Sequence, residues 1–331
     1  MSEDFVSLPK VELHSHLDCS LSYPTVARLG LDLSLAEYRE RFVAPARCKD
    51  LTEFLACVDP AVSVLQTKKA LEIAVDGMLV QQRDDNVVYA EMRFAPHLHQ
   101  ADGLALEEIV ETVLQTMHNS AQAHGVACGL ILCTLRHFSV AQGLEVAQLV
   151  RKYANQGVVA LDLAADEANF PIAPHVAAFR SVSDAGLHAT AHAGESKGAA
   201  SVAETLELLR VQRIGHGVRA IEDPDVVETL VSNGIHLEVC PTCNIQTGIF
   251  PDLAQHSLAA LRSSGVLLSL NTDARATTGV SLSEEYANVS RVFGWSASEM
   301  LEFSQNALHA SFASDEVKRK VQRQLDTYAG D

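Results

Sequence analysis

The segment VELHSHLDCS, residues 11–20, places two histidines and an aspartate in an otherwise apolar, strand-like pattern. Side chains alternate between the two faces of a β-strand, so His14, His16 and Asp18 would all point the same way. Burying two imidazoles and a carboxylate together costs free energy unless a metal ion, a hydrogen-bond network or open water satisfies them. The segment therefore predicts either a metal centre or a polar site at the end of a strand.

Strand-like runs recur along the chain, and a helix-like segment follows each of them. We expect eight strands, at residues 11–18, 87–95, 126–135, 158–164, 187–194, 213–217, 235–240 and 266–273. Repeated strand–helix units indicate parallel strands with crossover helices, and eight units in 331 residues favour a closed (β/α)8 TIM barrel over an open sheet. No linker rich in Gly, Pro or Ser interrupts the pattern, which predicts a single domain over residues 1–331.

Two segments exceed a minimal barrel. About seventy residues separate the first two expected strands, and residues 33–42, 51–60 and 68–83 within them have helical patterns. An insertion at this point lies on the face where barrel enzymes form their active sites, so we expect residues from about 30 to 70 to form a helical lid. The second half of the insertion would also suit one long packing helix. Residues 297–330 predict two closing C-terminal helices.

Composition excludes several classes of function. The formal net charge of −17 would repel polyphosphates, so we expect no nucleic-acid partner. No apolar run approaches the length of a membrane span, and the acidic N-terminus MSEDFVSLPK has no apolar core typical of a secretory signal. Seven cysteines without a framework spacing argue against a full disulfide set, and we therefore expect a reduced, cytoplasmic protein.

The unusual polar residues fall at the ends of the expected strands, where chemistry gathers in barrels. They are His14, His16 and Asp18 on the first, His192 and Glu195 (HAGE) on the fifth, His216 (IGHG) on the sixth and Asp273 (NTDA) on the eighth. One histidine in a strand is more often a core residue, but several at four strand ends of one barrel are hard to explain by packing. Imidazole and carboxylate ligands suit zinc or iron. The pattern predicts metal-assisted hydrolysis, in which bound zinc lowers the pKa of water to roughly 7.

VELHSHLD, HAGE, RIGHG and SLNTD, in this order and at these strand ends, resemble the adenosine deaminase family of the metal-dependent amidohydrolase barrels. The resemblance extends from about residue 8 to about residue 310, and DLAADE (162–167) and CPTCNIQTG (240–248) look like further family segments. It implies a TIM-barrel enzyme that uses one zinc ion per chain to remove the amine of an adenine nucleoside as ammonia.

The resemblance also implies a role for each matching residue. The zinc ligands would be His14, His16, His192 and Asp273. His216 would orient and deprotonate the attacking water, and Glu195 would protonate the purine ring nitrogen beside the amine-bearing carbon. A Glu195 that is protonated at neutral pH needs a raised pKa, which a dry, apolar pocket can supply.

Further residues match substrate contacts of the family. Asp18 would accept a hydrogen bond from the sugar 5′-hydroxyl, although a helix N-cap is the alternative interpretation. Leu51, Phe54 and Val58 match lid positions that line the apolar subsite, with a spacing that any packed helix would also show. Asp162 is a candidate hydrogen-bond partner for a ligand histidine.

Three positions depart from the family pattern. Cys19 and Ala165 stand where glycine is usual, and the backbone N–H of Ala165 would still meet a purine nitrogen. Ala274 stands where many members carry an acidic residue whose carboxyl contacts the imidazole ring of the purine. Alanine cannot make this contact, and losing it would cost about 1–3 kcal/mol of affinity for the usual substrate. We expect Arg275 or a water to replace that contact.

The departures leave the exact substrate open. Adenosine and 2′-deoxyadenosine are favoured, because Asp18 suits a nucleoside with a free 5′-hydroxyl. Adenine, or a 5′-substituted adenosine such as aminodeoxyfutalosine, remains the alternative.

Three other functions compete with this interpretation. Cys240 and Cys243 could form a zinc clamp, a redox pair or half of a cytidine-deaminase site, although the order Cys-Pro-Thr-Cys favours structural cysteines. A two-metal hydrolase commonly needs a bridging lysine or glutamate on the fourth strand, and VVALDLA (158–164) has no lysine. A non-catalytic binding barrel should have lost ligands or the proton donor, and the chain retains all six of these residues.

Overall fold

The computed structural model describes residues 5–330 and contains one eight-stranded sheet in which every neighbouring pair is parallel. The strands follow chain order: β1 (Lys10–His16), β2 (Val87–Phe94), β3 (Ala127–Leu135), β4 (Val158–Ala164), β5 (His188–Ala193), β6 (Arg213–His216), β7 (His236–Val239) and β8 (Leu267–Leu270). A parallel bridge between Ser15 and Asp273 joins the end of β1 to the segment after β8. The predicted (β/α)8 barrel is confirmed, and each strand lies within three residues of its expected bounds.

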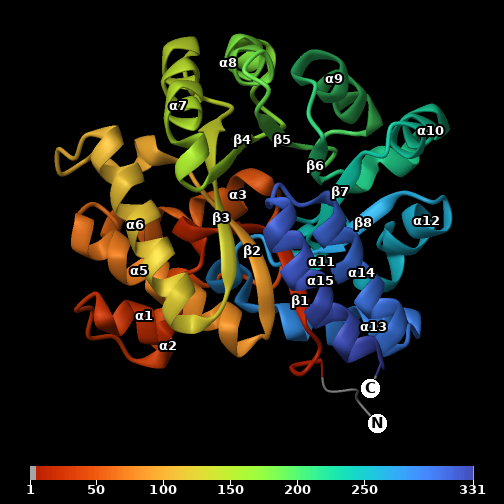
Figure 1. The fold of residues 1–331 in the computed structure, drawn as a ribbon, viewed down its shortest axis with the longest axis horizontal. Helices are drawn as coiled ribbons and strands as arrows, with labels where there is room; N and C mark the ends of the chain where they lie inside the picture. Colours follow the sequence, from red (N-terminus) through yellow and green to blue (C-terminus); the bar gives the residue numbers. More distant parts are fainter. Residues whose placement is uncertain (1–4, 331) are drawn as a thin grey trace.

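Helices surround the strands on the outside (Figure 1). Those between β2 and β8 are α6 (Leu106–His124), α7 (Val140–Tyr153), α8 (Val176–Ser183), α9 (Ala199–Leu209), α10 (Pro224–Ser232), α11 (Pro241–Gln246) and α12 (Leu258–Ser263). The helix α6 illustrates why these segments fold as they do. Ile109, Val110, Val113 and Met117 form its buried stripe, and Gly125 ends it in the left-handed conformation that glycine adopts readily.

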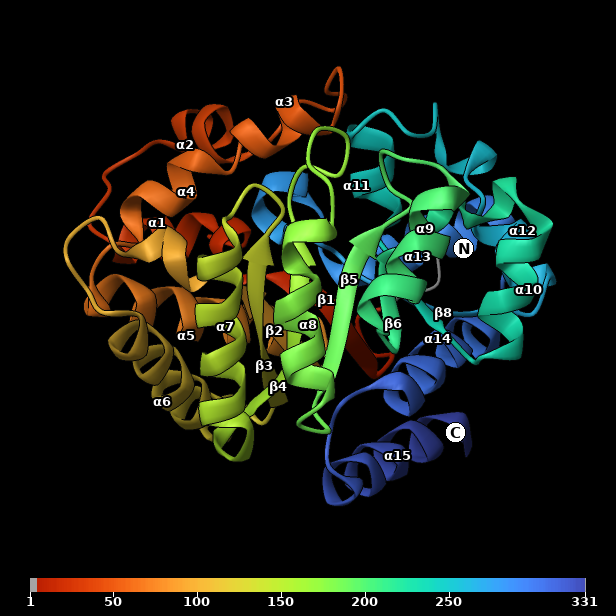
Figure 2. The same ribbon diagram turned by 90° about the horizontal axis from the view of Figure 1, so that it is seen from above.

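The insertion after β1 is helical, as expected. It contains α1 (Tyr23–Arg28), α2 (Leu35–Phe42), α3 (Leu51–Ala56), α4 (Asp59–Val64) and α5 (Lys68–Asp84), of which α1 was not predicted. Figure 2 shows the strand arrowheads pointing toward the side where α3 and α11 lie, while α15 lies at the opposite end. After β8 come α13 (Leu282–Phe293) and the two expected closing helices, α14 (Ala297–Ala310) and α15 (Asp315–Gly330).

The interior of the barrel is charged, and its charges are paired. The Arg213 guanidinium lies 2.5 Å from a Glu91 oxygen and 2.7 Å from a Glu238 oxygen. The Arg93 guanidinium lies 2.6 Å from Glu238 and 3.0 Å from Asp162. All five side chains are buried, and breaking one such pair would leave an uncompensated buried charge. The five side chains therefore form a chain of alternating negative and positive charges inside the barrel. Its order is Glu91, Arg213, Glu238, Arg93 and Asp162.

Two expectations from composition can be compared with the structure. All seven cysteines are free thiols. Within residues 5–330, no helix is both long and apolar enough to cross a membrane. A cytoplasmic location stays a prediction of the sequence.

Candidate active site

The four predicted metal ligands come together at the carboxyl ends of the strands. His14 and His16 lie on β1, His192 lies on β5, and Asp273 follows β8. One ligand atom from each of these four side chains lies within 4.8 Å of all the others. A second group that meets the same criterion shares His14 and Asp273 but adds His216 and Cys240. Among the described residues, Cys240 and Cys243 do not occur together in any such group, so the structure gives no support to a zinc clamp.

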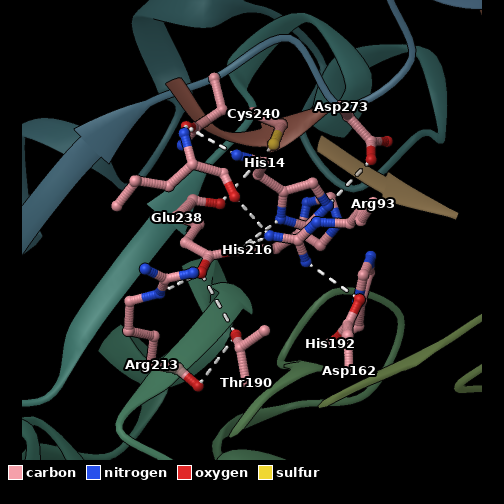
Figure 3. Close-up of polar contacts among 12 residues, drawn as sticks. His14, Arg93, Asp162, Thr190, His192, Arg213, His216, Glu238, Cys240 and Asp273 are labelled. Atoms are coloured by element: carbon pink, nitrogen blue, oxygen red, sulfur yellow. Dashed lines mark hydrogen bonds and ion pairs between the residues drawn. The ribbon is translucent and has the colours of Figure 1, made fainter. Parts of the chain in front are cut away.

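The surroundings of the ligands fit a metal ion. Nδ1 of His14 lies 2.9 Å from a Glu238 oxygen, and Nδ1 of His192 lies 3.2 Å from an Asp162 oxygen (Figure 3). A ring nitrogen that faces a carboxylate carries the proton, which leaves the Nε2 lone pair free for a metal. Nε2 of His14 is buried, has no hydrogen-bond partner and lies 3.0 Å from Asp273 Oδ1.

His16 completes this group. Its Nε2 lies 3.2 Å from Nε2 of His192 and 3.5 Å from Asp273 Oδ1. Burial lowers the pKa of His16 to about 3, so the ring is neutral at physiological pH and can act as a ligand. Gly215 makes space for the cluster, because a Cβ there would lie 2.9 Å from the His14 ring.

The backbone around the cavity adopts unusual conformations. Five non-glycine residues among those described have positive φ, and three of them lie here: Ala165 (77°), His216 (60°) and Asp273 (62°). This region is sparsely populated by residues with a Cβ and is often found at functional sites. Glycine would adopt the positive φ of Ala165 without strain.

A cavity of about 660 Å³, including its open mouth, lies beside the ligands. Of the predicted residues it is lined by Asp18, Leu51, Phe54, Val58, Ala165, Glu195 and His216, together with His16, His192 and Asp273. Cys19 and Ala274 also face it. A larger open groove of about 2090 Å³ lies near α2 and contains none of the four ligand residues. We therefore take the smaller cavity as the candidate active site.

Glu195 and His216 face each other inside this cavity. His216 Nε2 lies 3.7 Å from Glu195 Oε2, and both side chains are almost fully buried. Burial, reinforced by Asp273 and Glu167, raises the pKa of Glu195 well above its ordinary value. Burial lowers the pKa of His216 well below its ordinary value. The two shifts favour the protonated, uncharged form of Glu195 and the uncharged form of His216.

Glu167, in the DLAADE segment, holds the loop that carries Glu195. Its carboxylate accepts hydrogen bonds from the backbone N–H groups of Gly194, Glu195 and Lys197, at 2.8, 3.0 and 2.9 Å. Three backbone bonds to one buried carboxylate fix the loop geometry and satisfy the charge.

Asp18 lies in the cavity but not where the strand pattern placed it. β1 ends at His16, and Asp18 belongs to the short 3-10 turn η1 (Leu17–Cys19). Its Oδ2 lies 3.7 Å from His99 Nε2 and 3.4 Å from the backbone nitrogen of Ala95. Burial alone would raise the pKa of Asp18, but these contacts and His16 lower it, so the carboxylate is ionised.

Arg275 requires a correction. Its guanidinium lies 2.6 Å from Asp85 and 2.8 Å from Glu12, and it does not line the cavity. It begins a π-helical turn, η7 (Arg275–Gly279), on the far side of Ala274. The expectation that Arg275 replaces the missing acidic contact is therefore wrong, because both terminal nitrogens of its guanidinium are already paired with the buried carboxylates of Glu12 and Asp85.

Sequence reasoning missed the residues that support the site. Glu238 contacts His14 directly, Arg93 pairs with the Asp162 carboxylate that faces His192, and the amide nitrogen of Asn244 lies 3.1 Å from His216 Nδ1. Cys243 lies with its sulfur 2.9 Å from Asp273 Oδ2. The signal for Glu238 and Arg93 was a charged residue in an apolar strand, IHLEVC and VVYAEMRFA, which is the pattern that drew attention to His14.

A (β/α)8 barrel whose strand ends gather three histidines, an aspartate and a buried acid defines a class, the metal-dependent hydrolases. The family model for adenosine deaminase matches residues 9–328. An adenosine deaminase of Clostridium acetobutylicum is 33% identical over an alignment of 333 positions, gaps included. The alignment covers 98% of this chain and 99% of that protein. An adenosine deaminase of Enterococcus faecalis is 32% identical, with 96% of each chain covered. The chain belongs to the adenosine deaminase family and is a hydrolase that acts on C–N bonds.

Solved structures agree with this assignment. The crystal structure of an adenine deaminase from Arthrobacter aurescens has a TM-score of 0.89 and 29% identity, covering 98% of this chain and 100% of that one. Arabidopsis ADAL complexed with IMP has a TM-score of 0.87 and 26% identity, covering 98% and 97%. These two structures are thus named for different purines, adenine for the first and IMP for the second.

Proposed function

We propose that this chain is a zinc-dependent deaminase of an adenine nucleoside, with adenosine and 2′-deoxyadenosine as preferred substrates. One observation carries the proposal: Glu195 and His216 line the same cavity as His16, His192 and Asp273 of the four-residue metal group, and burial raises the pKa of Glu195 and lowers that of His216. Two relatives named adenosine deaminase support it, because each aligns with this chain over nearly its whole length.

His14, His16, His192 and Asp273 would hold one zinc ion per chain. Zinc bound there would lower the pKa of a water molecule, so that hydroxide would be available as the nucleophile at neutral pH. Glu195 would give its proton to the ring nitrogen beside the amine-bearing carbon, which makes that carbon electrophilic. His216 would orient the attacking oxygen. The C–N bond then breaks, and adenosine plus water yields inosine plus ammonia.

The remaining lining would bind the nucleoside. Asp18, an ionised acceptor, would take a hydrogen bond from the 5′-hydroxyl, and the backbone N–H of Ala165 would meet a ring nitrogen. Leu51, Phe54 and Val58 would cover the apolar part of the substrate. A position beside Ala274 and Cys19 offers no acidic contact, so the purine would bind there through packing or water.

The charge of the cavity favours a nucleoside over a nucleotide. Within the described part of the chain, neither lysine nor arginine lines the cavity, whereas Asp18 and Asp273 do. A phosphate would therefore lack a cationic partner and face a carboxylate. Free adenine is the second candidate, supported by the similarity to the Arthrobacter enzyme, and it would leave Asp18 without a substrate donor.

Ammonia release from a substrate panel tests the proposal. Zinc-loaded protein would be assayed with adenosine, 2′-deoxyadenosine, adenine, a 5′-substituted adenosine, AMP and cytidine. We expect the highest kcat/KM for the two nucleosides with a free 5′-hydroxyl and little release from AMP. Release from adenine or the 5′-substituted compound alone would overturn the substrate assignment, and release from none would overturn the proposed function.

A further inference from the structure

A chain of hydrogen bonds connects Leu258 to His216 through His256 and Asn244. Its first donor determines which atom donates and which accepts in each of these bonds. The backbone N–H of Leu258 donates to His256 Nδ1 at 3.0 Å, and a backbone N–H can only donate. His256 Nδ1 therefore carries no proton, and the ring proton must lie on Nε2. That nitrogen lies 3.2 Å from Asn244 Oδ1, which accepts the bond.

The direction continues through the amide of Asn244. With its oxygen committed to His256, the amide presents its nitrogen to His216, 3.1 Å from Nδ1. An amide nitrogen is a donor only, so His216 Nδ1 accepts and cannot carry a proton. An amide orientation is normally ambiguous, but here the Leu258 N–H at the end of the chain fixes it.

The packing around this relay prevents the alternative orientations. Asn244 is fully buried, and His256 and His216 are almost so. The Phe250 ring lies against His256, with 4.4 Å between the ring centroids. Reversing any one bond would leave a buried donor facing a donor, or an acceptor facing an acceptor, which costs about 1–3 kcal/mol.

We propose that Asn244 and His256 are positioning residues that hold His216 as the neutral Nε2–H tautomer, so that His216 presents a hydrogen-bond donor to the reacting oxygen. This inference rests on the proposed function for the identity of that oxygen. A nitrogen that carries a proton has no lone pair for a metal, so of the two candidate ligand groups only His14, His16, His192 and Asp273 remains. It also revises the predicted role of His216, because a donor can orient the attacking oxygen but cannot take its first proton.

The tautomer can be read directly by NMR. The zinc-loaded protein, labelled with ¹⁵N-histidine, would be recorded without substrate, and the His216 signals would be identified by their loss in His216→Gln. We expect a single neutral species with the proton on Nε2. A proton on Nδ1, or a doubly protonated ring, would overturn the proposal. Because no substrate is present, the result does not depend on which compound the enzyme deaminates.

Asn244→Asp provides a near-isosteric test of function. A carboxylate can still accept from His256, but it can only accept from His216, so the proton should move to Nδ1. We expect that shift in the spectrum and a fall in kcat of at least about tenfold with little change in KM, since a wrong tautomer disables a catalytic histidine.

The matched control is Thr247→Val, a buried change whose hydroxyl bonds only to the backbone carbonyls of Cys243 and Asn244. We expect it to retain kcat within about twofold and the wild-type tautomer. Asn244→Asp with an unchanged spectrum and kcat would contradict the proposal. If that variant does not fold, the wild-type spectrum decides alone.

Discussion

Asp273 depends on a contact that comes from another segment of the chain. Its Oδ1 faces His14 and His16, while its Oδ2 lies 2.9 Å from the sulfur of Cys243. Burial raises the pKa of Cys243 well above its ordinary value, so the thiol keeps its proton and donates to the carboxylate. This bond orients the proposed ligand, and groups that orient ligands affect metal affinity strongly.

We therefore predict that Cys243→Ala weakens zinc binding by about 10- to 100-fold. Cys243→Ser restores a donor and should bind within about threefold of the wild type. Competition with a chromophoric chelator would measure both affinities. Equal affinities for the alanine variant and the wild type would show that the thiol is only a packing group.

At the residue scale, the sequence predicted which polar side chains meet at the strand ends, but it did not predict most of the residues that contact and orient them. Three histidines and an aspartate at strand ends can be recognised because such residues are rare in buried strands. Arg275 was placed wrongly because the chain turns with positive φ at Asp273, after which Ala274 faces the cavity and Arg275 faces Glu12 and Asp85. A strand pattern does not contain that turn.

At the scale of elements, one buried acid joins α13 to α11 beside the site. The Glu285 carboxylate accepts hydrogen bonds from the backbone nitrogen of Thr242 at 2.7 Å and from its hydroxyl at 2.6 Å. Burial nevertheless raises the pKa of Glu285 to about 7. The folded state therefore binds a proton between about pH 4.5 and 7 that the unfolded state has lost.

The sign of this linkage gives a prediction. The contribution of Glu285 to stability is complete below pH 4.5 and is lost as pH rises toward 7, at a cost of about 3 kcal/mol. Glu285→Gln has no such titration, so its stability relative to wild type should improve by about 2–3 kcal/mol between pH 5 and pH 8.5. Denaturant unfolding at both pH values would measure the difference. Glu316→Gln, an exposed acid on α15, serves as control. An equal difference in stability between Glu285→Gln and wild type at both pH values would contradict the account.

Elements were predictable where periodicity was long. The strands β2, β3 and β4 and the helices α5 and α14 follow their patterns closely. The end of β8 was placed three residues too late. After Leu270 the Asn271 backbone N–H still donates to Val239 of β7, but on the β1 side it is the Asn271 side-chain oxygen that accepts from the backbone nitrogens of Leu13 and His14. Tertiary contacts of this kind override local pattern.

At the scale of the whole molecule, the fold followed from eight repeated strand–helix units, while the charged interior did not. Which carboxylate meets Arg93 or Arg213 depends on strand register and on closure of the barrel, and neither can be read from one strand alone. The result is a continuous path of paired charges from Glu91 to the carboxylates that hold His14 and His192. The stability of the barrel and the orientation of its proposed ligands thus depend on the same side chains.

The most direct test of the central claim compares zinc-loaded wild type and Glu195→Gln in the conversion of adenosine at neutral pH. We predict equimolar inosine and ammonia from the wild type. In the variant, kcat should fall by about 10²- to 10⁴-fold at unchanged zinc content, because glutamine cannot give a proton to the ring. A variant with wild-type kcat, or a zinc-loaded wild type that releases no ammonia, would contradict the account.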